Sequence, residues 1–154
     1  MAILSTFRET WTAQLQFVLF FLILAALIYN LVMLIGALRA LKEAENPINA
    51  HLIGPVYERY ANFPKTLRAL ALIALMVGLL GWAAVAYNAL SAAASLPGAV
   101  QARDLCGALA TASFILATGA FNATIAYASY CIFSGILALR YSRSIHKLAS
   151  RKGA

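Results

Sequence analysis

The pattern of apolar and polar positions divides the chain into three long apolar segments. They cover about residues 15–38, 67–90 and 108–139. Each is long enough to cross the roughly 30 Å hydrocarbon core of a bilayer as a helix. The third, at about 32 residues, would measure roughly 48 Å as a helix, so we expect it to tilt strongly or to continue beyond the bilayer. The pattern therefore predicts an all-α membrane protein, a single membrane domain with three transmembrane helices.

Prolines mark the breaks between these segments. Because the residue before a proline is disfavoured in a helix, we expect the first helix to continue to Glu45 and to stop at Asn46-Pro47. A short helix is expected around residues 54–62, with Asn62-Phe63-Pro64 opening the second span. In the segment 91–107, Pro97-Gly98 predicts a turn.

The composition supports a membrane protein. Hydrophobic residues make up 63% of the 154 positions and charged residues 11%, with a mean hydropathy of +0.81. A soluble domain needs more charge than this to cover its surface. The net charge of +7 would favour nucleic-acid binding in a soluble protein. Here the basic residues flank apolar segments, so the expected partner is the lipid membrane and not nucleic acid.

The basic residues also predict an orientation. Residues 39–68 and the tail 140–154 carry five each, whereas the N-terminal segment and residues 91–107 carry one each, Arg8 and Arg103. The positive-inside rule then places the N-terminus outside, the loop 39–66 in the cytoplasm, the loop 91–107 outside and the basic tail in the cytoplasm. The first segment is too long and lacks a cleavage site for a signal peptide, so we treat it as a span. Within the tail, the residues expected to contact lipid headgroups are Arg140, Arg143 and Lys147.

The sequence offers little catalytic or metal-binding chemistry. The middle of each span contains no Asp, Glu, Lys or Arg, so the chain has no carboxylate of its own for a proton relay. Ser/His/Asp and zinc-ligand arrangements are absent, and Cys106 and Cys131 form no metal or redox motif. The sequence thus predicts no enzyme activity, no cofactor and no metal site.

Neutral polar residues occur on one face of the third span. Thr111, Thr118, Asn122 and Ser129 follow a spacing of seven, four and seven, which places them along one side of a helix. Such residues commonly bond to a neighbouring helix or to their own backbone. Alternatively they line a path for ions or water. The candidate ion-pathway residues are Thr111, Thr118 and Asn122.

The second span carries small residues next to a large one. Gly78 and Gly81 each cost roughly 0.5–1 kcal/mol in a helix interior compared with alanine, which a closely packed neighbouring helix would offset. Spans two and three are therefore predicted to form a packed hairpin, with Gly78, Gly81 and Trp82 as helix-packing residues. The indole N–H of Trp82 is expected to seek a partner. The first span, rich in Leu, Phe and Ile, is expected to face lipid.

Two short motifs carry a family resemblance. Gly78-Leu79-Leu80-Gly81 is similar to the start of a G-L-L-G-T-V-x-G-like motif, and residues 106–112 are similar to the start of an E-A-L-x-x-T-A-x-G-L-like motif, most clearly at Thr111-Ala112. Over about residues 67–141 the chain resembles the MotA/TolQ/ExbB proton-channel family. The resemblance implies a multi-pass subunit of the bacterial inner membrane and a homo-oligomer around a single-span partner protein that supplies the protonatable acid.

The chain also departs from that family. Trp82 stands where the family has a pore-facing threonine, Phe114 replaces a glycine, and the cytoplasmic segment is shorter. Such bulky residues would narrow or dry a pathway. An alternative function therefore stays open, that of a non-catalytic structural or accessory subunit of a larger membrane complex. A small-molecule transporter is a weaker alternative, because alternating access usually needs repeats around a site at the bilayer midplane.

Overall fold

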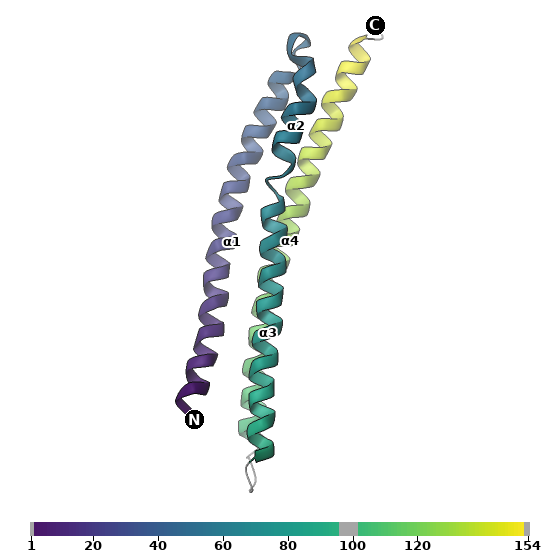
Figure 1. The fold of residues 1–154 in the computed structure, drawn as a ribbon. Coiled ribbons are helices and arrows are strands. Elements are labelled where there is room, and N and C mark those ends of the chain that lie inside the picture. Colours follow the sequence, from purple (N-terminus) through teal and green to yellow (C-terminus); the bar gives the residue numbers. More distant parts are fainter. Residues whose placement is uncertain (1, 96–101, 153–154) are drawn as a thin grey trace. The chain divides into compact units, whose positions relative to one another are not determined.

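The computed structural model of the protein describes residues 2–95 and 102–152, which are mostly helical. In chain order the elements are α1 (Ala2–Ala44), the 3₁₀ helix η1 (Pro47–Leu52), α2 (Ile53–Ala61), α3 (Lys65–Ser95) and α4 (Ala102–Lys152) (Figure 1). The predicted turn at Pro97-Gly98 lies outside the described residues. So do the side chains of Arg8, Arg103, Arg151 and Lys152.

Three apolar stretches of these helices are long enough to cross a membrane. They are Gln14–Ala44, Ile48–Ala94 and Asp104–Ser150. The prediction of an all-α, multi-pass membrane protein with three candidate spans is thus confirmed by length and composition. The orientation of the termini stays a prediction from the charge pattern.

The prolines break the helices where the sequence predicts. Asn46 adopts an extended conformation, with φ −67° and ψ 134°, directly after α1 and before Pro47. The short helix expected around residues 54–62 is α2, and α3 starts immediately after Pro64. The sequence did not predict η1. The helices also run further than the predicted spans, since α3 continues to Ser95 and α4 begins at Ala102.

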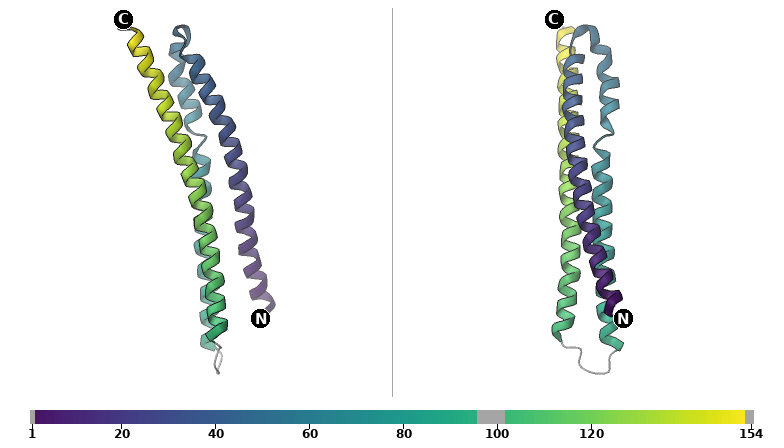
Figure 2. Two further views of the ribbon diagram at one scale, coloured as in Figure 1. Left: turned by 180° about the vertical axis from the view of Figure 1, so that it is seen from behind. Right: turned by 90° about the vertical axis from the view of Figure 1, so that its left-hand side faces the viewer.

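The chain divides into two compact units, which are described separately. The first contains residues 2–23, 70–95 and 102–125 of the described chain. Here α3 and α4 lie side by side (Figure 2), and Val85, Ala112 and Ile115 form a small buried cluster between them. This is the packed hairpin that the small residues predicted.

The second unit contains residues 24–69 and 126–152. Its core is larger and includes bulky side chains. Tyr57 of α2 stacks on Tyr141 of α4 with ring centroids 4.1 Å apart. The buried cluster consists of Leu34, Ala37, Leu41, Ala44, Ile53, Phe63 and Leu137.

Helix α1 is not wholly lipid-facing, contrary to the expectation from its composition. Most of the large apolar side chains that the structure describes in α1 are exposed, but one stripe is buried, at intervals of three, four or seven residues. A segment that is apolar all round shows no periodicity, so the buried side could not be read from the sequence. The buried positions are Gln16, Leu19, Ile23, Asn30, Leu34, Ala37, Leu41 and Ala44.

Candidate functional site

The hydroxyls of the predicted pathway face bond to their own helix. Thr111 is exposed and donates to the carbonyl of Gly107 at 3.1 Å, and Thr118 donates to the carbonyl of Phe114. Such bonds to a residue one turn earlier are the usual way for threonine to satisfy its hydroxyl in a membrane helix. The oxygen of each hydroxyl can still accept a hydrogen bond, but its proton is already donated to a backbone carbonyl of α4.

Asn122 differs from the two threonines because it bonds to another helix. It is buried, and its Nδ2 donates to both the backbone carbonyl and Oε1 of Gln16, each at 3.2 Å. The structure therefore does not bring Asn122, Thr111 and Thr118 together in one contact. Gln16 was missed in the sequence analysis. The signal that could have indicated it is an amide side chain close to the start of a long apolar segment.

Gln16 lies over a glycine contact between α3 and α4. A Cβ atom built on Gly119 would lie 2.6 Å from the Cα of Gly78, 2.9 Å from the carbonyl oxygen of Ala74 and 3.0 Å from Nε2 of Gln16. No side chain fits there, so the two backbones touch because both residues are glycine. Nε2 of Gln16 is buried and has no hydrogen-bond partner among the described residues.

The three predicted packing residues of the second span occupy different environments. Gly78 is in the glycine contact and Gly81 is buried. Trp82 lies outside that contact, with 41% of its surface exposed. Phe114, the other bulky departure from the family motifs, is 68% exposed. The rings of Trp82 and Phe114 thus lie on the exposed surface of this unit.

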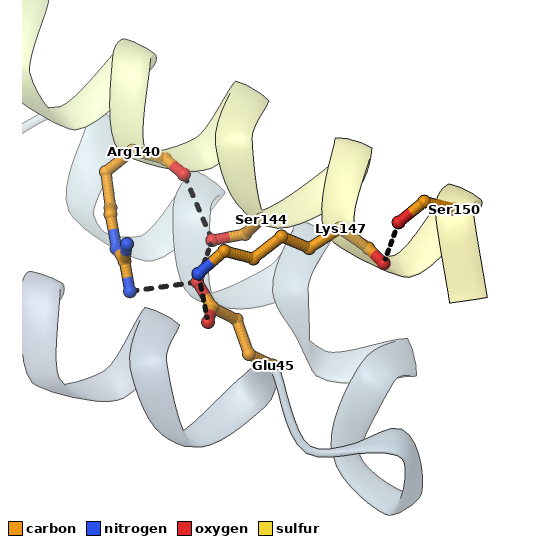
Figure 3. A network of polar contacts seen from close by, with 5 residues as sticks. All are labelled: Glu45, Arg140, Ser144, Lys147 and Ser150. Carbon is orange, nitrogen blue, oxygen red and sulfur yellow. Dashed lines mark hydrogen bonds and ion pairs between the residues drawn. The ribbon is translucent and has the colours of Figure 1, made fainter.

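The second unit contains a charged cluster around Glu45, directly after α1 (Figure 3). Its carboxylate pairs with Arg140 at 2.9 Å and Lys147 at 3.3 Å, and accepts a hydrogen bond from the Ser144 hydroxyl at 2.9 Å. Two of the three predicted headgroup residues are therefore engaged within the protein. The third, Arg143, is exposed.

The surroundings of Glu45 change its acidity in opposing directions. Burial alone would raise the pKa of its carboxyl group. The hydrogen bonds from Ser144 and Lys147 and the positive charges of Arg140 and Lys147 outweigh burial, so the pKa lies below its ordinary value. Glu45 is thus held as a carboxylate, and its proton is not available for exchange at neutral pH.

An open groove of about 650 Å³ lies in the same unit, between η1, the start of α2 and the last turns of α4. Its lining is mostly apolar, and His51 and Tyr141 contribute its side-chain polar atoms. Among the described residues, no group of His, Cys, Asp and Glu is arranged to hold a metal ion.

Comparison of the chain with protein-family models, with curated proteins and with solved structures finds no match. The resemblance to the MotA/TolQ/ExbB family therefore rests on the two short motifs and the order of the spans.

Proposed function

We propose that this protein is a helical scaffold subunit of a membrane assembly, with the architecture of the MotA/TolQ/ExbB type. The observation that carries this proposal is the neutral character of the contacts within the spans. Gln16 bonds to Asn122, and Asn30 bonds to Thr66, without an ionisable group in either contact. Such contacts hold helices together in hydrocarbon but do not move protons.

The exposed surface of the helices supports assembly with further chains. Large apolar side chains are exposed on all three long helices, including Phe17 of α1, Trp82 of α3 and Phe114 of α4. In the proposed assembly these faces contact lipid, other copies of the chain or a single-span partner. The positive charge of the loop 39–66 and of the tail supports a cytoplasmic position for both, and the bacterial inner membrane is the proposed location.

In this proposal any conducted ion passes along the face of α4 that carries Thr111, Thr118 and Asn122. The chain has no charged residue between positions 108 and 139, so a partner must supply the protonatable acid. The subunit itself is neither an enzyme nor a cofactor carrier. Arg143 is the residue of the tail proposed to contact anionic headgroups, because Arg140 and Lys147 are paired with Glu45.

Copy number is the test of the scaffold proposal. The protein is extracted in mild detergent and its complexes are weighed by native mass spectrometry. A ring of several copies around a single-span chain is the expected result. A single copy among many unlike subunits would reject the ring.

Ion flux tests the pathway separately. Proton and sodium fluxes are compared in vesicles with and without the co-purified partner. The Thr118→Val variant should reduce flux, whereas Thr124→Val should not, since the exposed Thr124 also bonds only to its own helix but is not a pathway candidate. An intact oligomer with no flux above empty vesicles would reject conduction and leave the scaffold role.

A second candidate is a structural subunit of a larger complex that conducts nothing. The exposure of Trp82 and Phe114 favours it, because two large rings would then fill contacts with a neighbouring subunit. The copy-number measurement distinguishes this function from the first.

A further inference from the structure

The groove between η1, α2 and α4 lies where the protein is expected to meet lipid headgroups. Its lining from α4 extends from Tyr141 to Ala149. At a rise of about 1.5 Å per residue, these positions lie roughly 3–15 Å beyond Leu139, where the third span is predicted to end. A bilayer has a headgroup layer of roughly 5–8 Å on each side of its hydrocarbon core, so the Tyr141 end of the groove falls within that layer.

Apolar surface at this groove is exposed although it lies outside the predicted spans. Ile145 lines the groove and is exposed, and on η1 the side chains of Leu52 and Ile48 are exposed, Ile48 to 81%. Exposed apolar surface next to polar residues marks a contact with a ligand, a partner or a membrane. The groove volume of about 650 Å³ is within the range of clefts that hold small molecules.

The unit that contains the groove carries the whole net charge of the chain. That charge is +7, and outside residues 39–68 and 140–154 two basic residues are balanced by two acidic ones. Both ranges belong to the second unit. Arg140 and Lys147 each directly precede a residue that lines the groove, and they share a single carboxylate, that of Glu45. One positive charge of this set is therefore left over, which favours an anionic occupant.

We propose that the groove binds one anionic phospholipid per chain, with the phosphate at His51 and the acyl part along the apolar lining. The proposal rests on the membrane position and cytoplasmic orientation proposed for the loop 39–66 and the tail, and it adds a defined lipid site to the headgroup contact of Arg143. The imidazole of His51 and the hydroxyl of Tyr141 can each donate a hydrogen bond to a phosphate oxygen.

The charge of this unit selects the class of lipid. Basic clusters directly cytoplasmic of a span attract anionic headgroups, and basic pockets between membrane helices bind them. A zwitterionic headgroup carries a positive group of its own, which the surrounding basic residues repel. The groove should therefore distinguish two phospholipids that have the same acyl chains but a different net charge.

Native mass spectrometry of the full chain in mild detergent measures this binding. Delipidated protein is titrated with dioleoylphosphatidylglycerol or, as the control, with dioleoylphosphatidylcholine. We expect saturation at one phosphatidylglycerol per chain, with an affinity about 5–30-fold higher than for phosphatidylcholine, as one or two engaged basic residues would give at about 1 kcal/mol each. Equal affinity for the two lipids, or uptake of several lipids without saturation, would overturn the proposal.

Filling the groove tests where the lipid binds. Gly54 lines the groove, and a Cβ atom built on it meets nothing within 4 Å, so Gly54→Leu has room for its side chain and should abolish saturable binding. Gly135→Leu is the matched control in the same unit. Its Cβ atom also meets nothing within 4 Å, but Gly135 does not line the groove, so this variant should bind as wild type does. Equal binding by the two variants would mean diffuse attraction to the basic tail and would overturn the site.

A second variant and the copy number complete the test. If Gly54→Leu does not fold, Ala149→Phe, at an exposed position on the α4 side of the groove, replaces it. The same spectra report copy number and bound lipid as separate masses. One bound phosphatidylglycerol per chain in a complex that is not a ring would reject the ring and keep the lipid site, whereas a ring without saturable lipid would do the opposite. A co-purified chain that Gly54→Leu releases would make a protein segment the occupant and would also overturn the lipid proposal.

Discussion

The two units hold their helices together with different chemistry. In the first, the backbones of Gly78 and Gly119 touch, and a neutral amide pair, Gln16 and Asn122, joins α1 to α4. In the second, large side chains form the core, and Glu45 gathers two cationic side chains. Both units also contain one buried amide with an unsatisfied atom, a donor on Gln16 and an acceptor on Asn30.

The difference follows from the surroundings that the sequence predicts. The Gln16–Asn122 contact lies in the predicted spans, where an unpaired charge would be costly and apolar burial drives little association. Within the spans, the helices are therefore held together by close backbone contact and by neutral hydrogen bonds. Glu45 and Arg140 follow the predicted ends of spans one and three, where water and headgroups can solvate the exposed parts of charged side chains. Ion pairs such as those of Glu45 can therefore help to hold the helices of the second unit together.

The largest effect should come from filling the glycine contact. Gly119→Ala places a methyl group 2.6 Å from the Cα of Gly78 and 2.9 Å from the carbonyl oxygen of Ala74, and these two backbone atoms cannot rotate away. We expect a loss of about 1–3 kcal/mol in the free energy of unfolding. Titration with sodium dodecyl sulfate in mixed micelles measures it.

Gly107→Ala in the same helix is the matched control. A Cβ atom at Gly107 meets nothing within 4 Å, so this variant should be unchanged or more stable by about 0.5–1 kcal/mol. Equal stability of the two variants would mean that the glycine contact does not hold the first unit together.

A smaller effect is expected from removing the amide contact. Asn122→Ala deletes the donor to Gln16 and leaves the buried Oε1 of Gln16 without a partner. Hydrogen bonds between membrane helices contribute about 0.6 kcal/mol on average and up to about 1.7, so we expect a loss in that range. Thr124→Val should cost less in the same denaturation assay, because its hydroxyl bonds only to Ala120 of its own helix. A larger loss for Thr124→Val would contradict this ranking.

The smallest effect should come from the charged cluster. Glu45→Gln removes two ion pairs in a partly exposed setting, and we expect a loss of about 0.5–1 kcal/mol that shrinks as salt is added. Glu43→Gln is the control. Glu43 is exposed, and this substitution removes the same charge two residues away from Glu45. A loss for Glu45→Gln that salt does not change would exclude the ion pairs as its cause.

The same carboxylate predicts how stability depends on pH. Because the pKa of Glu45 is lowered in the folded protein, its contribution is complete above the ordinary glutamate pKa, about 4.3. As the pH falls below that value the unfolded chain binds a proton first, and the contribution is lost once the pH passes the lowered pKa. Denaturation at pH 7 and at decreasing pH should therefore show a loss in wild-type protein that Glu45→Gln does not share.

Local features of the chain were sufficient to predict the helices but not their contacts. Asn46-Pro47 and Pro64 end and start helices through the backbone geometry of proline alone, and both breaks lie where the sequence placed them. The partners of Asn122 and Glu45 could not be predicted, because each lies about a hundred positions away in the chain. The sequence also grouped Trp82 with Gly78 and Gly81, although its ring lies outside the glycine contact.

The sequence by itself determined the number of apolar spans, the positions of the breaks and the charge at each flank, since these depend only on neighbouring residues. The tertiary structure decided which side of each helix is buried. The span of α1 is apolar on every side, so its sequence does not indicate which side is buried. The hydrogen bonds between Gln16 and Asn122 and between Asn30 and Thr66 define that side. In hydrocarbon, burying apolar surface does not favour one side of an apolar helix over another. The packed side is therefore selected by those few neutral contacts and by one pair of glycines.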